Sequence, residues 1–455
     1  MREPQIARRV RPGLVVLPLA LSVIASAREG ETEQLLRDAH AAVDARDFDG
    51  AIARFTEVID LGAATQAQKI EAHEGRGSCQ LAKGEAEPAI DDFTAALSLG
   101  ERSATVFVMR ATARGWLHDE QGALDDFGEA IRLAPEDATA YYNRGLLEAR
   151  LGHAPAATAD LGRAIELQPD FDAAYANLAK VEGVLSPEKA LATLSRGIER
   201  KPTALLYFSR ASFRAKSDDA ISDLGHALEL KPDFGEAYAN RAIAYTAKKD
   251  YEHAVQDLAH AIALMPGVAE LHTDRAALLC RLGRFLEGKD ELDRAILADP
   301  RFASAYRTRG QVLFGLGRFD DAARDLDRYL KQGNPDKYAT LALFLARARS
   351  GGESAAVLLA YPAADPPEWP DPVADLFRGR VEGAALMAAA AKGDEAKAVD
   401  RLCEAHFYLA ERALLAGETG SAKEHFQKCV ATGKSDFWEY QCAAIALEGL
   451  GNAKP

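Results

Sequence analysis

The sequence predicts an all-α fold, a right-handed α-solenoid of stacked antiparallel helix pairs, on the basis of three observations. A short phrase of small and apolar residues recurs along the 455-residue chain, and successive copies lie 30 to 38 residues apart, most of them 34. A Pro follows many copies, where it would end the second helix of a pair. Aromatic residues make up only 7% of the chain, so the core must consist mainly of Ala and Leu, which suits closely packed helices.

The first 27 residues have the pattern of a cleaved secretory signal. Basic residues between positions 2 and 11 precede an apolar run at 14–24, and Ala25 and Ala27 supply the small residues that a signal peptidase reads. The run is too short to cross a bilayer as a helix, so we expect no transmembrane segment in the mature chain. No Cys follows it, which argues against lipid attachment. We therefore expect a periplasmic protein. The alternatives are a disordered N-terminus or a wrongly assigned start codon.

Residues 32–361 hold about ten copies of the recurring phrase. The phrase is Ala, an aromatic residue or Leu four positions later, usually Ala three positions after that, and often Pro five positions further on. Ala123, Phe127, Ala130 and Pro135 form one copy. The first members of the copies are Ala51, Ala89, Ala123, Ala157, Ala190, Ala220, Ala254, Gly288, Ala322 and Ala356.

A second apolar stripe precedes each phrase, and in several units it contains Tyr-x-x-Arg-Gly or Tyr-x-x-Arg-Ala, as at residues 141–145. Each unit therefore codes two amphipathic helices. The period, the small residues and the terminal Pro together resemble the tetratricopeptide repeat. The resemblance implies a solenoid in which stacking neighbours bury the apolar faces and the first helix of each unit lines a concave groove.

Seven units carry an Arg in the first helix and an acidic residue 13 or 16 positions later in the second. These charges swap or vanish together in the remaining units, which predicts a contact within each helix pair. If exposed, such a pair contributes about 0–1 kcal/mol. The predicted pairs are Arg76 with Asp92, Arg110 with Asp126, Arg144 with Asp160, Arg210 with Asp223, Arg241 with Asp257, Arg275 with Glu291, and Arg309 with Asp325.

The pattern changes after the repeats. Residues 362–372 contain five Pro, so residues 362–402 are expected to form a Pro-rich linker followed by a helical insert at about 373–391. Residues 403–455 then predict a final repeat-like hairpin and a capping helix. Cys403 would begin the first helix of this hairpin and Cys429 would end the second, so a disulfide between them is one option. A link between Cys429 and Cys442, or free thiols, are the others.

This ending resembles the NlpI-type periplasmic lipoproteins. The matching features are Trp369-Pro370, Phe407-Tyr408-Leu409, Gly417, Ala422, Phe426 and Glu439-Tyr440. The resemblance implies an adaptor that docks proteases and cell-wall hydrolases, often as a homodimer. The chain departs from that family in lacking a lipid-accepting Cys and in carrying more repeats.

Candidate partner-binding residues come from the first helices. Asn143, Asn177 and Asn240 occupy the same position in the fourth, fifth and seventh units. An Asn amide can both donate to and accept from a peptide backbone, so a row of them could hold an extended chain. The alternative is that Asn is simply common at this position in such repeats. The residues one position earlier, which we expect to add stacking or carboxylate contacts, are Tyr142, Phe208 and Arg307.

The sequence predicts no catalytic residue, cofactor or metal site. His253 and His260 lack a metal-binding spacing, and Lys428 stands where a phosphate loop ending at Gly433 would need Gly. A net charge of −14, or −17 after removal of the four Arg and one Glu of residues 1–27, argues against nucleic-acid binding. The predicted function is a non-enzymatic scaffold in the cell envelope that binds proteins or extended peptides. The alternatives are a cytosolic co-chaperone or assembly factor, or an accessory subunit of an envelope enzyme complex.

Overall fold

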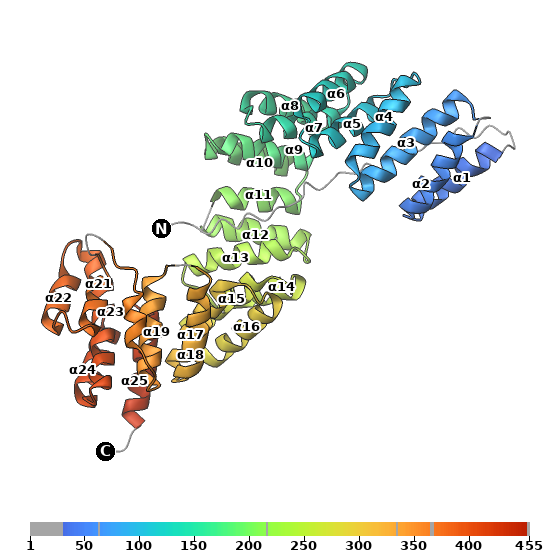
Figure 1. Ribbon diagram of the computed structural model, residues 1–455. Coiled ribbons are helices and arrows are strands. Elements are labelled where there is room, and N and C mark those ends of the chain that lie inside the picture. The colour runs from blue at the N-terminus through green and yellow to red at the C-terminus, as the bar shows by residue number, and fades with distance from the viewer. Residues whose placement is uncertain (1–30, 62–63, 215–216, 334, 365–367, 453–455) are drawn as a thin grey trace. The chain divides into compact units, whose positions relative to one another are not determined.

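The computed structural model describes residues 31–61, 64–214, 217–333, 335–364 and 368–452. These residues form 25 α-helices that follow one another along the chain, and none of the described segments is a strand (Figure 1). The predicted signal, residues 1–27, lies outside them. The chain divides into two compact units, residues 1–168 and 169–455. Within each unit the helices pack in successive pairs, which confirms the predicted fold class.

The first unit contains four helix pairs. The second helix of each pair packs on the first, and the first helix of the next pair packs on it in turn. The pairs are α1 (Glu31–Asp44) with α2 (Phe48–Asp60), α3 (Gln66–Lys83) with α4 (Ala86–Ser98), α5 (Ala104–Trp116) with α6 (Glu120–Leu133), and α7 (Ala138–Arg150) with α8 (Ala154–Leu167).

The second unit continues with six pairs of the same kind and five further helices. The pairs are α9 (Asp172–Gly183) with α10 (Pro187–Arg200), α11 (Ala204–Arg214) with α12 (Asp218–Leu230), α13 (Gly235–Ala247) with α14 (Tyr251–Leu264), α15 (Ala269–Arg281) with α16 (Phe285–Ala298), α17 (Ala303–Gly315) with α18 (Phe319–Lys331), and α19 (Lys337–Arg349) with α20 (Ala355–Leu359). The further helices are α21 (Asp371–Phe377), α22 (Gly383–Ala391), α23 (Glu395–Leu415), α24 (Thr419–Ala431) and α25 (Trp438–Asn452).

In most of the pairs, the turn between the two helices contains one residue in the left-handed conformation. Gly152 fills this place between α7 and α8 with φ of 81°, which costs a glycine little. His118 takes the equivalent place between α5 and α6 with φ of 61°. The following Asp119 then caps α6, because its carboxylate accepts a hydrogen bond from the backbone N–H of Gly122. The turn and the cap together fix where the second helix begins.

The recurring phrase forms the contact between the two helices of a pair. In α6, Ala123 and Ala130 are fully buried and Phe127 is nearly so. Opposite such positions the first helix carries a small residue. A Cβ atom added to Gly145 of α7 would lie only 2.9 Å from Cγ of Leu161 in α8. The close approach of the backbones therefore explains why Ala and Gly, not aromatic residues, dominate these positions.

All seven predicted Arg–acid pairs form, with N–O distances of 2.6 to 2.7 Å. In six of them the guanidinium makes two parallel hydrogen bonds or more to the carboxylate group, while Arg275 makes one. The acidic side chains are only 4 to 10% exposed. The value for an exposed pair therefore does not apply, because a carboxylate buried this deeply depends on its cation.

The structure corrects two boundaries in the C-terminal region. The sequence predicts one helical stretch at 373–391, whereas the chain forms α21 and α22, separated by a turn at Gly379 with φ of 73°. The sequence also predicts that the last hairpin begins at Cys403. Its first helix, α23, begins at Glu395 and is 21 residues long, so Cys403 lies within the helix. No Pro or Gly stands between 395 and 403 to stop the helix there.

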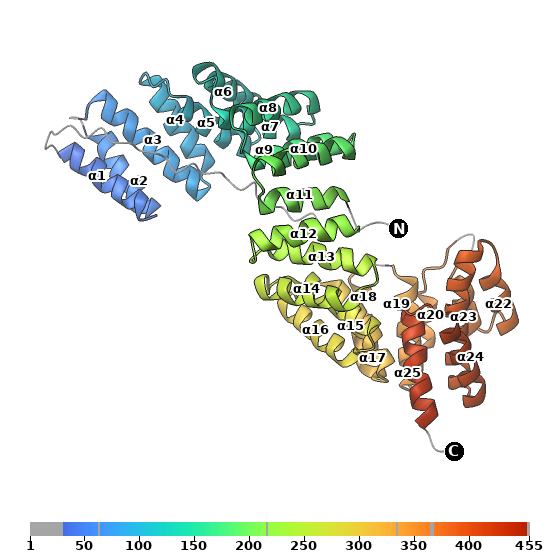
Figure 2. The ribbon, with the colours of Figure 1, turned by 180° about the vertical axis from the view of Figure 1, so that it is seen from behind.

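The last helix packs back onto the ninth pair. α25 contacts α17 and α23 (Figure 2). The indole Nε1 of Trp438 donates a hydrogen bond to the carbonyl of Gln311, at 3.0 Å, and its ring meets Phe314 edge-on. Helices from α17 to α25 consequently share one hydrophobic core.

Asp371 holds the end of the Pro-rich segment. Its carboxylate is buried and accepts hydrogen bonds from the Tyr361 hydroxyl and from the backbone N–H groups of Ala364 and Glu368. Lys337 lies 2.8 Å away. Although burial opposes ionisation, these partners keep the pKa of Asp371 below its usual value. Asp371 therefore links Tyr361, Ala364 and Glu368 to the start of α21.

Candidate functional site: the exposed face of the first helices

The six residues expected to contact a partner lie on five first helices. In the first unit, Tyr142 and Asn143 are on α7. The other four belong to the second unit: Asn177 on α9, Phe208 on α11, Asn240 on α13 and Arg307 on α17.

The three Asn side chains differ in how much hydrogen-bonding capacity they retain. Asn143 and Asn240 are half-buried, and within the described residues their amides have no hydrogen-bond partner. The Nδ2 of Asn177 instead donates to the carbonyl of Ala173, 2.9 Å away in the same helix. Asn240 is therefore the residue of the second unit whose amide is best prepared to meet a peptide backbone.

The three residues one position earlier are buried or make contacts with other residues of the chain. Tyr142 is only 7% exposed, so it offers little surface to a partner. Phe208 packs against Phe234, with ring centroids 4.7 Å apart. The Nε of Arg307 donates to the carboxylate of Asp336, at 2.7 Å, and Asp336 also caps α19. Sequence reasoning did not find this carboxylate, because Asp336 lies 29 residues away and is placed only by the stacking of two pairs.

Acidic residues on the same face were missed. Asp274 of α15 occupies the repeat position of Asn240 and is exposed. Glu236 and Glu270, one helical turn earlier on α13 and α15, are exposed as well. Aligning the units in register would have found all three, since each lies a fixed number of residues before its phrase. Asn240, Glu236, Glu270 and Asp274 are called the amide–acid row below.

On the other side of the first helices, several arginines link neighbouring pairs. The guanidinium of Arg76 also donates to Thr56 of the preceding pair, and Arg210 donates to Ser195. Arg309 meets Asp293 of the preceding pair instead of a Ser or Thr, and the two side chains form an ion pair at 2.6 Å. Asp293 also forms an ion pair with Lys289, at 2.7 Å.

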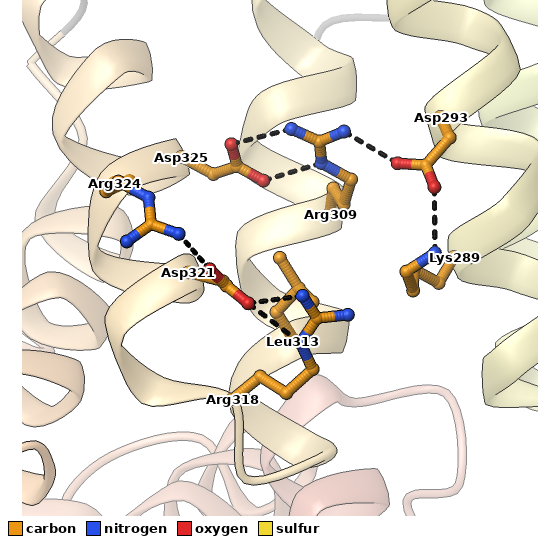
Figure 3. Close-up of a pocket in the computed structure, with 8 residues that line it drawn as sticks. All are labelled: Lys289, Asp293, Arg309, Leu313, Arg318, Asp321, Arg324 and Asp325. Carbon is orange, nitrogen blue, oxygen red and sulfur yellow. Dashed lines mark hydrogen bonds and ion pairs between the residues drawn. The ribbon is translucent and has the colours of Figure 1, made fainter.

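A pocket of about 290 Å³ lies beside these ion pairs, among α16, α17 and α18 (Figure 3). Arg309 stands at its centre, bonded to Asp325 on one side and Asp293 on the other. Arg318 and Arg324 both contact Asp321. Leu313 completes the lining, which includes no hydroxyl, thiol or imidazole among the described residues. The lining carries four cationic and three acidic side chains, and every one of them takes part in an ion pair within the pocket. The pocket is therefore a widened part of the inter-pair arginine contacts.

Two of the buried carboxylates among the C-terminal helices accept hydrogen bonds from neutral side chains. Glu404 of α23 accepts a hydrogen bond from Nε1 of Trp369, at 2.7 Å, and Glu439 of α25 accepts one from the hydroxyl of Tyr408, at 3.2 Å. Burial and the neighbouring charge of Glu439 raise the pKa of Glu404 to about 8. Burial also raises the pKa of Glu439. Glu404 is thus mainly protonated at neutral pH.

Two searches of the described residues bear on other kinds of site. No group of three or more His, Cys, Asp or Glu side chains in this part of the chain is placed to hold a metal ion. None of the helices formed by these residues has an apolar stretch long enough to span a bilayer.

Comparison with solved structures finds matches of low sequence identity and low TM-score. The crystal structure of MamA protein has 24% sequence identity, with 37% of this chain and 91% of that chain covered and a TM-score of 0.34. Yeast Tom70 has 14% identity, with 92% and 95% covered and a TM-score of 0.32. A tetratricopeptide repeat protein from Parabacteroides merdae ATCC 43184 has 18% identity, with 69% and 98% covered and a TM-score of 0.29.

Among curated proteins, no sequence matches the chain. Family models give a direct result. One model of the tetratricopeptide repeat matches residues 36–104, 110–173, 273–337 and 308–368, and another matches residues 235–267. These matches span more than half of the 455 residues. The chain therefore belongs to the tetratricopeptide repeat family.

Proposed function

We propose that this protein is a non-enzymatic scaffold that binds an extended segment of another protein along the first helices of its second unit. Tetratricopeptide repeats in general support protein interaction. The observation that carries the proposal is the free amide of Asn240, which lies on the exposed face of α13 together with Glu236. Such an amide can pair with the N–H and C=O groups of an extended backbone.

The charges of the amide–acid row define the chemistry of the segment. Glu236, Glu270 and Asp274 are exposed, and Arg307, a cation on the next first helix, is already paired with Asp336. A partner segment with Lys or Arg side chains would complement this surface, whereas an acidic segment would be repelled. Binding of this kind should weaken as ionic strength rises.

Photo-crosslinking tests the location of the binding surface. A benzophenone amino acid at Asn240 of α13 should trap the partner, while the same group at Gln256, exposed on α14 of the same pair, should not. Equal yields at both positions would contradict the proposal, because the partner would then not distinguish the two helices.

Alanine substitutions test the role of the amides. N240A should weaken partner retention in a pull-down titration without changing the unfolding midpoint. N177A provides a matched control, because the Asn177 amide is already bonded to Ala173 and should contribute less. An N177A effect as large as that of N240A would remove the free amide from the explanation. Asn143, in the first unit, provides a separate comparison.

For the cellular setting, we propose export to the periplasm, supported by the basic start, the apolar run and the small residues of positions 1–27. The resemblance of the C-terminal region to NlpI-type lipoproteins suggests envelope proteases or cell-wall hydrolases as partners, and a homodimer as the working form. N-terminal sequencing of the protein from fractionated cells tests export, and an intact Met1 would contradict it. Sedimentation velocity tests the dimer.

A further inference from the structure

Two buried thiols face each other across the last hairpin. Sγ of Cys403 in α23 and Sγ of Cys429 in α24 lie 3.5 Å apart, and both side chains are fully buried. The two helices pack along each other as the hairpin of 395–431. A disulfide needs sulfur atoms about 2.0 Å apart, so an approach of about 1.5 Å separates this contact from a bond. Rotation about the Cα–Cβ bonds can supply part of that movement.

From this geometry we propose that Cys403 and Cys429 form a disulfide that fastens α24 to α23. The position of the pair distinguishes it from the other cysteines. Cys442 is buried on α25, Cys280 on α15 and Cys79 on α3 of the first unit. Among the described residues, Cys403 and Cys429 alone bring their sulfur atoms into contact. The structure therefore selects one of the two pairings that the sequence leaves open.

The chemistry requires an oxidant, which we take to be a small-molecule disulfide such as oxidised glutathione. One protein thiolate attacks it and releases one glutathione thiol, leaving a mixed disulfide. The second protein thiolate then displaces the second glutathione. The two protein thiols lose two electrons and two protons, and the glutathione disulfide becomes two thiols. Since both protein thiols are fully buried once α23 and α24 have packed, the exchange takes place during folding.

The bond would close a loop whose ends are 26 residues apart. It would thereby reduce the conformational freedom of the unfolded hairpin and stabilise the core that α23 and α24 share with α17 and α25. Its formation does not depend on what the protein binds, so it can be tested separately from the proposed function.

The experiment refolds the full chain from denaturant in a glutathione redox buffer, followed by denaturation and alkylation. Before alkylation, the mass of the refolded chain should be about 2 Da lower than that of the reduced chain. Alkylation should then modify three of the five Cys residues. Digestion should give one linked pair of peptides, carrying Cys403 and Cys429. Reduction with a phosphine should lower the melting temperature by about 5 °C or more.

Two variants sharpen the result. C442S should keep both the link and the response to the reductant, whereas C403S should lose both. Because the mass and alkylation measurements use the wild-type chain, they stand even if C403S folds poorly. Five alkylatable thiols after oxidative refolding, or a linked peptide that contains Cys442, would overturn the proposal.

Discussion

The helix pairs and the C-terminal region both bury carboxylates, but they stabilise them differently. In the pairs, a guanidinium supplies the opposite charge: Asp257 accepts two hydrogen bonds from Arg241. In the C-terminal region, Glu404 and Glu439 accept hydrogen bonds from neutral groups of Trp369 and Tyr408. No Lys or Arg within the described residues forms an ion pair with either of these two acids. Two other buried acids of the C-terminal region do have cations, since Glu411 pairs with Arg349 at 2.7 Å and Asp371 with Lys337 at 2.8 Å. The contrast is therefore between the buried acids of the Arg–acid pairs and the two carboxyls of Glu404 and Glu439.

This difference reflects where the partners come from. An Arg and its acid lie 13 or 16 residues apart in the same pair, so the contact can be copied with the repeat. The cluster around these two acids is assembled from four parts of the chain: Tyr338 of α19, Trp369 before α21, Glu404 and Tyr408 of α23, and Glu439 of α25. Such a cluster cannot be repeated.

The largest expected effect is the loss of a guanidinium that has no substitute. R241A leaves Asp257 buried without its cation, and the free energy of unfolding should fall by about 3–5 kcal/mol in urea titrations. The matched control is R241M/D257L, which replaces both partners by apolar groups and should recover most of the loss. A fall of less than about 1 kcal/mol for R241A would show that the repeats do not depend on the pair.

The second effect tests the protonated acid. Glu404 has a pKa of about 8 in the folded chain and an ordinary value of 4.5, so the folded state holds the proton more tightly between these values. The contribution of this carboxyl to stability is therefore fully present below pH 4.5 and is lost as pH rises through 8, at up to about 1.4 kcal/mol per pH unit. E404Q should remove this dependence. Parallel pH profiles for wild type and variant, measured by chemical unfolding, would contradict the assignment.

A smaller loss is expected where a second guanidinium remains. Arg110 pairs with Asp126, but Arg114 also contacts Asp126, at 2.8 Å. R110A should therefore lower the free energy of unfolding by about 1–2 kcal/mol, less than R241A. The double variant R110A/R114A should approach the R241A loss. If the single and double variants behave alike, Arg114 does not support the buried acid.

The smallest effect is expected at an exposed pair. Arg132 and Glu129 form an ion pair on the surface of α6, and both side chains are about half exposed. R132A should leave the unfolding midpoint unchanged within error, because solvent competes for both charges. A clear shift would mean that burial is not what separates the strong pairs from the weak ones.

Contacts between residues of one repeat could be predicted from the sequence, whereas contacts between different helix pairs could not. The pairing of Arg241 with Asp257 could be predicted, because the charges keep register with a repeat that the sequence displays openly. The pairing of Arg307 with Asp336 could not, since it joins two neighbouring helix pairs and the sequence offers no second copy for comparison. Likewise, Asn240 and Asn177 look equivalent in sequence. Only the structure shows that Asn177 bonds to its own helix.

The sequence alone determined the number and register of the helix pairs, the turns between them and the seven Arg–acid contacts, since all of these depend on spacing within about 34 residues. The tertiary structure decided what depends on distant segments. It set the return of Trp438 to Gln311 and the approach of Cys403 to Cys429. The physical reason is that a periodic pattern specifies contacts between neighbours, whereas burial against a remote helix leaves no period in the sequence.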